Sequence, residues 1–325
     1  MSSTIKSNPI STQTARQTPP QTNRRGRLYE IRKTLRRPQF WFGLAVLLPG
    51  IAWYAIFAFY PVLRSFTMAF TNYNFLDASK TRFVGFENFV TVTQHALFPI
   101  ATKNTLIYAA ELWLFTFPTA FAIALALVNI NRGRNVFQFT IFIPVVVSLV
   151  AMSLFFKQLF DPDTGAVNAL LHMVGLPESK WLTSPKTALV TVALVDSWKI
   201  LGSYMVLLTA GLLNIPPEFY DAAKVDGANA WQTFTRVTIP LLAHVLVLIV
   251  TMLLIAGLQV FVSATLLPPQ PGGPAYATTV LSIWLFNEAF NNWRFGFASA
   301  ITIVLFLIVF IVSLVQLRIR PNWEY

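Results

Sequence analysis

The sequence predicts an all-α membrane protein with six transmembrane helices, and its composition and apolar pattern both support this fold class. Apolar residues make up 55% of the 325-residue chain and charged residues only 11%, against roughly 25% in a soluble domain. Mean hydropathy is +0.58. The apolar residues gather in stretches of about 20 residues or more, the length that crosses a bilayer. We place the spans near residues 40–66, 104–130, 136–159, 187–213, 239–267 and 295–317.

The first 39 residues form a basic tail that precedes the membrane domain at 40–325. Residues 1–27 are rich in Ser, Thr, Gln, Pro and Arg, which predicts disorder, and they lack the apolar core of a cleavable signal peptide. Leu28, Ile31 and Leu35 recur among Arg and Lys in the segment 28–37. This pattern predicts a basic amphipathic helix that lies on the inner membrane leaflet.

Positive charge indicates which side of the membrane each loop faces. The side with the tail also carries the basic residues of the loops at 131–135 and 214–238 and of the C-terminus. The other side holds only eight, which are Arg64, Lys80, Arg82, Lys103, Lys157, Lys180, Lys186 and Arg294. Lys and Arg accumulate in cytoplasmic loops, so we expect both termini in the cytoplasm. We therefore interpret the net charge of +11 as a signal of membrane topology. The expected partner of the basic residues is membrane lipid rather than nucleic acid.

A polar segment of small residues at 215–240 separates the fourth and fifth spans. Pro216 and Pro217 suit the first turn of a helix, because proline loses no hydrogen bond there. Gly227 is placed to end that helix, since glycine adopts the left-handed conformation at no steric cost. Asn229, with a glutamine three residues on, predicts a capping box that opens a second helix. We expect a helix–glycine–helix docking surface here, with an ordinary interfacial loop as the alternative.

The same segment resembles the EAA loop of ABC importer membrane subunits, which holds the ATP-hydrolysing partner. The resemblance is carried by Asp221, Ala222, Ala223, Asp226, Gly227, Ala228, Phe234, Ile239 and Pro240. Asp221 stands where the family usually has Glu. The resemblance implies that these residues couple ATP hydrolysis to transport. Gly227→Pro, or a bulky side chain at Ala223, is then expected to uncouple the two.

Further segments between residues 40 and 320 resemble the same family. FVGFENFVTV, WKILGSYMVLLTAGLL and GGPAYATT look like parts of the first of two membrane subunits in carbohydrate importers of the maltose-permease type. The resemblance implies a type I ABC importer transmembrane domain with a cytoplasmic coupling helix in the bacterial inner membrane. It also implies a second homologous permease subunit in a heterodimer, an extracytoplasmic substrate-binding protein and two ATP-binding subunits. ATP and Mg are expected on those subunits, and this chain is expected to hold no cofactor.

Asp196 and Lys199 are notable charges within a predicted span. A charge at a helix centre costs about 2.5 to 3.5 kcal/mol on insertion scales, so both should face the bundle interior or a water-filled cavity. Their spacing of three residues places them on one face of the helix. They form either a structural pair, joined by Glu111, or part of a substrate pathway.

The resemblance to the maltose importer implies sugar contacts at Asp196, Lys199, Ile200 and Ser203. A sugar pocket combines hydrogen-bonding groups with aromatic faces, which adds four candidates, Trp198, Tyr204, Gln259 and Ser263, although rings in so aromatic a chain also serve as packing. The positions that match the maltose subunit's sugar-binding asparagines are Gly257 and Val260, so we expect a different glycan. Lys199 favours an acidic saccharide such as a uronate oligomer. Sugar phosphates of the glycerol-phosphate type are the alternative substrates.

Two outer segments carry weaker signals. The proline-rich loop from Leu267 to Arg294 is too stiff and polar to enter lipid, and it predicts either a docking edge for the binding protein or a plain turn. Residues Asp161 to Gly165 are similar to the start of a calcium loop. His172 stands where the bidentate Glu belongs, so we interpret this segment as a turn.

Missing motifs narrow the function. The chain has no cysteine, no GxxxxGK[ST] motif to cradle ATP phosphates, and no HExxH motif or His–carboxylate cluster for a metal. We therefore expect no catalytic and no metal-binding residues. Two other classes remain: an ion-coupled secondary transporter that uses Asp196, Lys199 and Glu111 as a relay, and a membrane scaffold or sensor. The chain has only six predicted spans and no evident internal repeat, which argues against an ion-coupled secondary transporter.

Overall fold

The computed structural model describes residues 37–318 except 74, 76–77 and 131. The tail predicted to be disordered lies outside these residues, as does the amphipathic helix predicted at 28–37 apart from Arg37. The chain divides into two compact units, residues 1–63 and 64–325, with the boundary inside one helical segment.

A long apolar helix accounts for the described part of the first unit. Helix α2 (Pro38–Tyr54) starts with Pro38 in its first turn and continues through a π-helical turn at Ala55–Phe59 into α3 (Tyr60–Met68). The whole run from Pro38 to Met68 is long and apolar enough to cross a membrane, which confirms the first predicted span.

The second unit is a helical bundle. Its helices are α4 (Glu87–Gln94), α5 (Leu97–Val128), α6 (Arg134–Val146), α7 (Leu149–Leu159), α8 (Ala166–Met173), α9 (Ala188–Leu213), α10 (Pro217–Val225), α11 (Ala230–Thr233), α12 (Ile239–Leu258), α13 (Val262–Leu266), α14 (Leu281–Phe286) and α15 (Phe295–Arg318). Shorter turns are 3-10 helices at Ala78–Lys80, Trp181–Thr183 and Pro274–Tyr276 and π-helices at Phe234–Thr238 and Asn287–Asn291.

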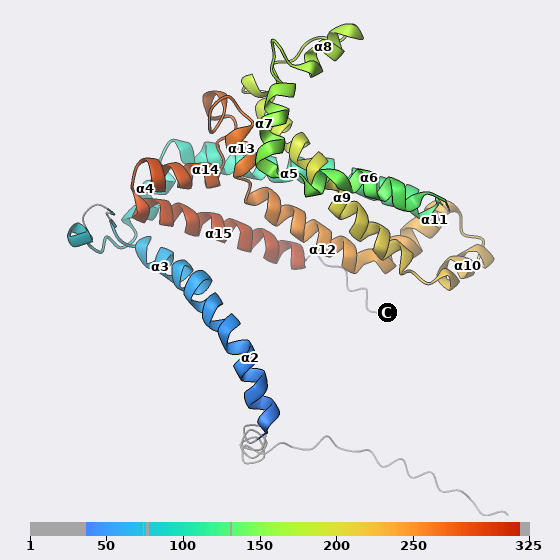
Figure 1. Ribbon diagram of the computed structural model, residues 1–325, viewed down its shortest axis with the longest axis horizontal. Coiled ribbons are helices and arrows are strands. Elements are labelled where there is room, and N and C mark those ends of the chain that lie inside the picture. The colour runs from blue at the N-terminus through green and yellow to red at the C-terminus, as the bar shows by residue number, and fades with distance from the viewer. Residues whose placement is uncertain (1–36, 74, 76–77, 131, 319–325) are drawn as a thin grey trace, which may run out of the picture. The chain divides into compact units, whose positions relative to one another are not determined.

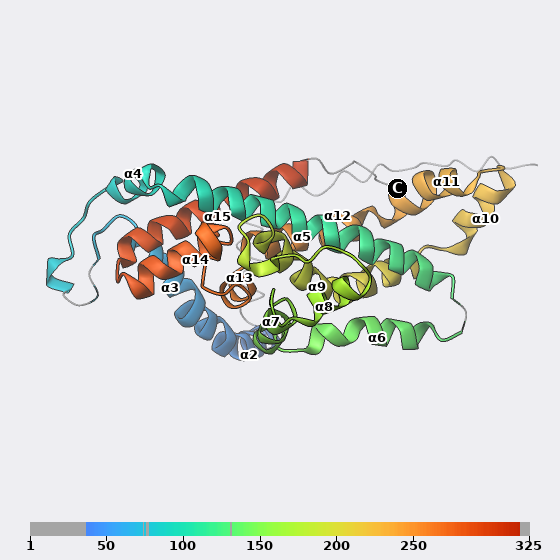
Figure 2. The same cartoon turned by 90° about the horizontal axis from the view of Figure 1, so that it is seen from above.

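Helices α5 and α9 form the centre of the bundle, with α12 against α5, α6 against α9, and α15 against α4, α12 and α14. Figures 1 and 2 show these helices side by side along one direction. Glycines permit the closest approaches, because a Cβ at Gly202 would lie 2.6 Å from the Ile141 carbonyl oxygen and one at Gly257 would lie 2.7 Å from the Ala109 Cα. Small residues serve this purpose at helix contacts within membranes.

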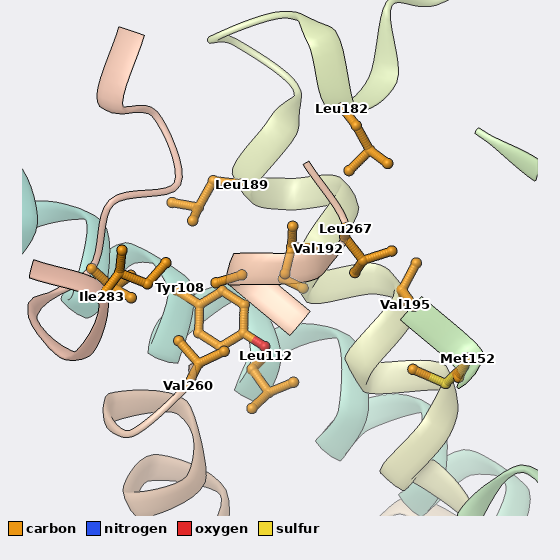
Figure 3. Packing of buried hydrophobic residues seen from close by; sticks show 13 residues of the cluster. Tyr108, Leu112, Met152, Leu182, Leu189, Val192, Val195, Val260, Leu267 and Ile283 are labelled. Atoms are coloured by element: carbon orange, nitrogen blue, oxygen red, sulfur yellow. The ribbon is translucent and has the colours of Figure 1, made fainter. Parts of the chain in front are cut away.

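The bundle has two distinct ends. Helices α10 and α11 lie at one end, and α4 lies at the other (Figures 1 and 2). Between the two ends, buried apolar side chains pack where the central helices meet. Figure 3 shows one such cluster, in which Tyr108 of α5 lies among Leu112, Val192 and Val260.

The span predicted at 136–159 is bent. Its two parts, α6 and α7, meet at 94°, so the described chain has five helical segments long and apolar enough to cross a membrane, or six spans if this pair counts as one. Pro144 lies in the last turn of α6 and Val147 is extended (ψ 138°). Proline offers no N–H to the helical ladder, which favours an end here.

The segment from Leu267 to Arg294 is more than a plain turn. It contains helix α14, whose Leu281, Ile283 and Trp284 are buried. Apolar side chains at these positions pack into the bundle, while the Pro-Gly stretch before them remains a loop. The fifth span is also interrupted, because residues 259–261 between α12 and α13 are not helical.

Candidate functional site

The segment 215–240, called the coupling loop below, forms the helix–glycine–helix structure that its sequence predicts. Helix α10 has Pro217 in its first turn together with Glu218, whose charge suits the positive end of the helix dipole. It ends at Val225, and Gly227, two residues later, adopts φ +73°. The Ala228 N–H donates to the Ala223 carbonyl at 2.9 Å and the Gly227 N–H to the Lys224 carbonyl at 3.1 Å. These two bonds are those of a Schellman motif.

The second helix begins with the predicted capping box. The Gln232 N–H donates to Asn229 Oδ1 and the Asn229 N–H donates to Gln232 Oε1, each at 2.9 Å. Both helix ends beside Gly227 are therefore capped, and only residues 226–229 connect α10 to α11.

Exposure divides the predicted coupling residues into three sets. Asp221, Ala222, Asp226 and Gly227 are exposed, and Ala228 and Phe234 are half-buried. Ala223 is only 7% exposed, so its methyl group packs inside this subunit. A bulky side chain at Ala223 therefore disturbs the subunit's own packing, whereas the adjacent Ala222 offers an accessible surface.

The exposed surface of the coupling loop is partly apolar. Val225 is 87% and Trp231 71% exposed, and Phe219 lies nearby on α10 at 49%. Asp221 and Lys224 form an ion pair at 3.0 Å in which both side chains remain accessible. Apolar side chains beside accessible charges are typical of a protein-docking surface.

Aromatic rings link the coupling loop to the centre of the bundle. Phe234 lies 5.8 Å from Trp231 on one side and 5.8 Å from Phe121 of α5 on the other. Phe121 continues into a stack with Phe117 and Trp113 along α5, with centroid distances of 5.9 and 5.6 Å. Phe234 thus contacts both the coupling loop and the central helix α5.

The second cluster of predicted site residues lies around Asp196, which is 8% exposed. Its Oδ2 atom accepts hydrogen bonds from the hydroxyl groups of Tyr108 on α5 and Ser263 on α13. Next to it, Thr116 of α5 donates to Ser197 at 2.9 Å. Asp196 Oδ1 and Glu111 Oε2 are buried and have no hydrogen-bond partner among the described residues.

Lys199 forms a hydrogen bond elsewhere and no ion pair with Asp196, despite their spacing. Its Nζ donates to the carbonyl oxygen of Val145 at 3.0 Å, at the end of α6. Among the described residues Lys199 forms no ion pair, so the expected Asp196–Lys199–Glu111 pairing is not present there. A cation at a helix C-terminus stabilises the exposed carbonyls and the negative end of the dipole.

The other pathway candidates are dispersed. Tyr204 is 7% exposed and belongs to an apolar cluster with Ile200 packed against it. Trp198 packs edge-on against Phe156 at 5.2 Å. Gln259 is exposed at the interruption between α12 and α13, and Ser203 is half-buried on α9. Two of the polar candidates are joined by a hydrogen bond, Ser263 and Asp196.

Tyr108 was missed by the sequence reasoning, although it donates directly to Asp196. A signal existed, because a tyrosine hydroxyl inside a membrane span needs a polar partner, and Asp196 is one of few acids in the spans. The turn at 161–165 was interpreted correctly. Asp161 Oδ1 accepts from the N–H groups of Asp163 at 3.1 Å and Thr164 at 2.8 Å, and from the Thr164 hydroxyl.

Comparison with known proteins defines the class to which this bundle and its coupling loop belong. Residues 117–325 match the family described as "Binding-protein-dependent transport system inner membrane component". The chain belongs to this family. The match confirms the expected resemblance to the membrane subunits of ABC importers.

Individual relatives cover most of the chain. It is 32% identical to the diacetylchitobiose uptake system permease protein NgcF of Streptomyces coelicolor, over 90% of this chain and 85% of that protein. It is also similar to a bacterial ABC transporter involved in the import of the acidic polysaccharide alginate, with a TM-score of 0.76, 28% identity, and coverage of 90% and 98%. A related structure holds that alginate transporter with an alginate pentasaccharide-bound periplasmic protein, with a TM-score of 0.75, 29% identity, and coverage of 89% and 96%.

Proposed function

We propose that this chain is a permease subunit of an ATP-driven importer that takes up an oligosaccharide delivered by a binding protein. The observation that carries the proposal is the doubly capped coupling loop with its exposed Val225 and Trp231, in a chain whose family is binding-protein-dependent. The saccharide specificity is supported by the names of the relatives, which take up diacetylchitobiose and alginate.

The proposed assembly has four further protein subunits. A second, homologous permease subunit completes the membrane domain, two ATPase subunits dock on the cytoplasmic side, a binding protein docks outside, and the saccharide passes between. Closure of the ATPase subunits pushes on α10 and α11, and the ring contacts of Phe234 with Phe121 pass the movement to α5. The chain itself then needs no catalytic residue.

Single cysteines test the ATPase contact and the orientation together, because the natural chain has none. Val225→Cys is expected to cross-link to an ATPase subunit, and to react with an impermeant maleimide only in inside-out vesicles. Met173→Cys is the matched control, since it is 80% exposed on α8 in the loop assigned to the other side. Cross-linking of both residues, or of neither, contradicts the proposal.

Purification supplies an independent test. The tagged chain, extracted from its native membrane in mild detergent, is expected to carry a second permease and an ATPase whose hydrolysis rises when saccharide-loaded binding protein is added. Recovery as a homo-oligomer without an ATPase supports instead an ion-coupled transporter, in which uptake follows an ion gradient.

An acidic saccharide is the second candidate substrate, favoured by the similarity to the alginate importer. In this reading Lys199 attracts the uronate carboxylate. The bond of its Nζ to the Val145 carbonyl gives it a structural role instead. Lys199→Gln separates the two readings, because it lowers uronate uptake selectively only if the charge acts on the substrate.

A further inference from the structure

A cavity lined by both polar and aromatic residues lies at the end of the bundle opposite the coupling loop. It has a volume of about 630 Å³ and is lined by three segments: the chain after α3, helix α4, and the chain from Asn292 into the start of α15. Small-molecule sites typically measure roughly 300 to 1,000 Å³. In the orientation proposed above, this cavity opens on the extracytoplasmic side, away from the buried cluster around Asp196.

The Trp293 ring is part of the lining. Trp293 is 47% exposed and stacks on Phe75 with centroids 5.6 Å apart and planes at 25°. Its backbone lies at φ +57°, a conformation that costs free energy for a residue with a side chain. The fold therefore holds the Trp293 ring in place at a cost, and an indole ring is an apolar surface of the kind that covers the C–H face of a pyranose.

Oriented amides are also part of the lining. Asn88 Nδ2 donates to the carbonyls of Ala69 and Thr71 at 2.8 and 2.9 Å, which leaves its Oδ1 as acceptor. Asn72 Oδ1 accepts from the Arg82 N–H at 2.7 Å, which leaves its Nδ2 as donor. Amides fixed in this way present both donors and acceptors, as sugar hydroxyl groups require.

The charges of the cavity disfavour an anion. Arg294 forms an ion pair with the buried Glu288 at 3.2 Å, and its guanidinium lies 4.3 Å from the centre of the Phe297 ring. Glu87, also in the lining, is exposed and forms no ion pair among the described residues. The charge that remains uncompensated at the cavity is thus negative, and a carboxylate is also a strong acceptor for sugar hydroxyls.

We infer that the cavity formed by Asn72, Glu87, Asn88, Trp293 and Arg294 is an outer saccharide-binding site that selects neutral over acidic sugars. The choice of saccharide as ligand rests on the proposed function, whereas the cavity, its Trp293 ring and its charge do not. Such a site gives the delivered oligosaccharide a second contact before it enters the membrane.

The inference is tested with the full chain and its co-purified partners in lipid nanodiscs. Equilibrium dialysis with lactose and diacetylchitobiose as neutral probes, and a mannuronate disaccharide as the acidic one, is expected to show preference for the neutral sugars. Trp293→Gly removes the ring and also relieves the backbone, so it is expected to weaken their binding about tenfold without loss of thermal stability.

Charge reversal supplies a second readout. Glu87→Ala is expected to weaken neutral binding, and Glu87→Lys to shift preference toward the mannuronate probe. The control Glu178→Ala alters an exposed glutamate outside the lining and is expected to change neither. Unchanged binding in Trp293→Gly and Glu87→Ala, or preference for mannuronate in the natural chain, overturns the inference.

The two proposals fail in different ways. Absent sugar-stimulated ATP hydrolysis together with absent uptake refutes the importer function. Uptake and stimulation that persist in both cavity variants, with unaltered direct binding, refute the outer site alone.

Discussion

Lys199 Nζ donates a hydrogen bond to the carbonyl oxygen of Val145, 3.0 Å away, at the point where α6 ends and the chain bends by 94° into α7. A charge is costly inside a membrane span. The Lys199 ammonium instead faces carbonyl groups at the C-terminus of α6, which have no partner within the helix. Lys199 thus caps the helix end at which the chain bends.

Removal of this cation is expected to loosen the end of α6. In Lys199→Met the Val145 carbonyl loses its donor, at a cost of about 1.5 to 3 kcal/mol for a bond to a charged group, partly offset because the cation no longer needs solvation. Hydrogen–deuterium exchange should rise in peptides that cover residues 145–150. Lys157→Met, in the last turn of α7, is the control. Equal exchange in the natural chain and Lys199→Met contradicts the capping role.

Gly227 is expected to tolerate asparagine but not proline. Its φ of +73° costs about 1 to 2 kcal/mol for an ordinary residue, and no neighbouring atom lies within 4 Å of the position that a Cβ would occupy, so Gly227→Ala tests the backbone alone. We expect Gly227→Asn to keep transport, Gly227→Ala to reduce it, and Gly227→Pro to abolish it while ATP hydrolysis continues. The ratio of saccharide transported to ATP hydrolysed in proteoliposomes measures this. Full coupling in the proline variant rules out a hinge at this residue.

The hydroxyl groups around Asp196 are expected to stabilise the bundle. Tyr108→Phe removes one donor to its Oδ2 atom and Ser263→Ala removes the other. Each change leaves a buried acceptor less satisfied, which costs about 1 to 3 kcal/mol. The thermal midpoint of the purified complex should fall in both variants and fall furthest in the double variant. Tyr54→Phe, on an exposed side chain, serves as control.

The turn at Asp161 is expected to depend on pH. Hydrogen bonds from Thr164 lower the pKa of Asp161 below its usual range. The ionised form therefore stabilises the turn at every pH above the ordinary value of about 3.9, and this stabilisation is lost as the pH falls through the lowered pKa of the folded state. A spin label at Asp163→Cys should become mobile only in strong acid. The same label in an Asp161→Ala background should be mobile at neutral pH, and equal mobility of the two at pH 7 contradicts the role of Asp161.

The coupling loop was predictable because its structure is determined locally. Pro217, Gly227 and Asn229 each act on backbone groups within a few residues, so the sequence contains all the partners. The apolar spans were predictable for a similar reason, since length and hydropathy are properties of one segment.

The contacts of Asp196 were not predictable in this way. Its donors Tyr108 and Ser263 are 88 and 67 residues distant in the chain, and nothing local specifies which helices meet. The bend after α6 was also missed, although Pro144 lies beside it. Pro49 and Pro118 lie within helices that continue past them, so a proline alone does not distinguish a bend from a tolerated kink.

Because of the bend between α6 and α7, the thickness of the surrounding bilayer affects how α6 fits into the membrane. With 13 residues, α6 is about 20 Å long, whereas the hydrocarbon layer measures about 30 Å. The missing length has to be supplied by local thinning of the lipid or by neighbouring protein. Short acyl chains relieve this hydrophobic mismatch and long ones increase it. Two membranes that differ only in acyl-chain length thus present the same subunit with different mechanical loads at the helix end held by Lys199.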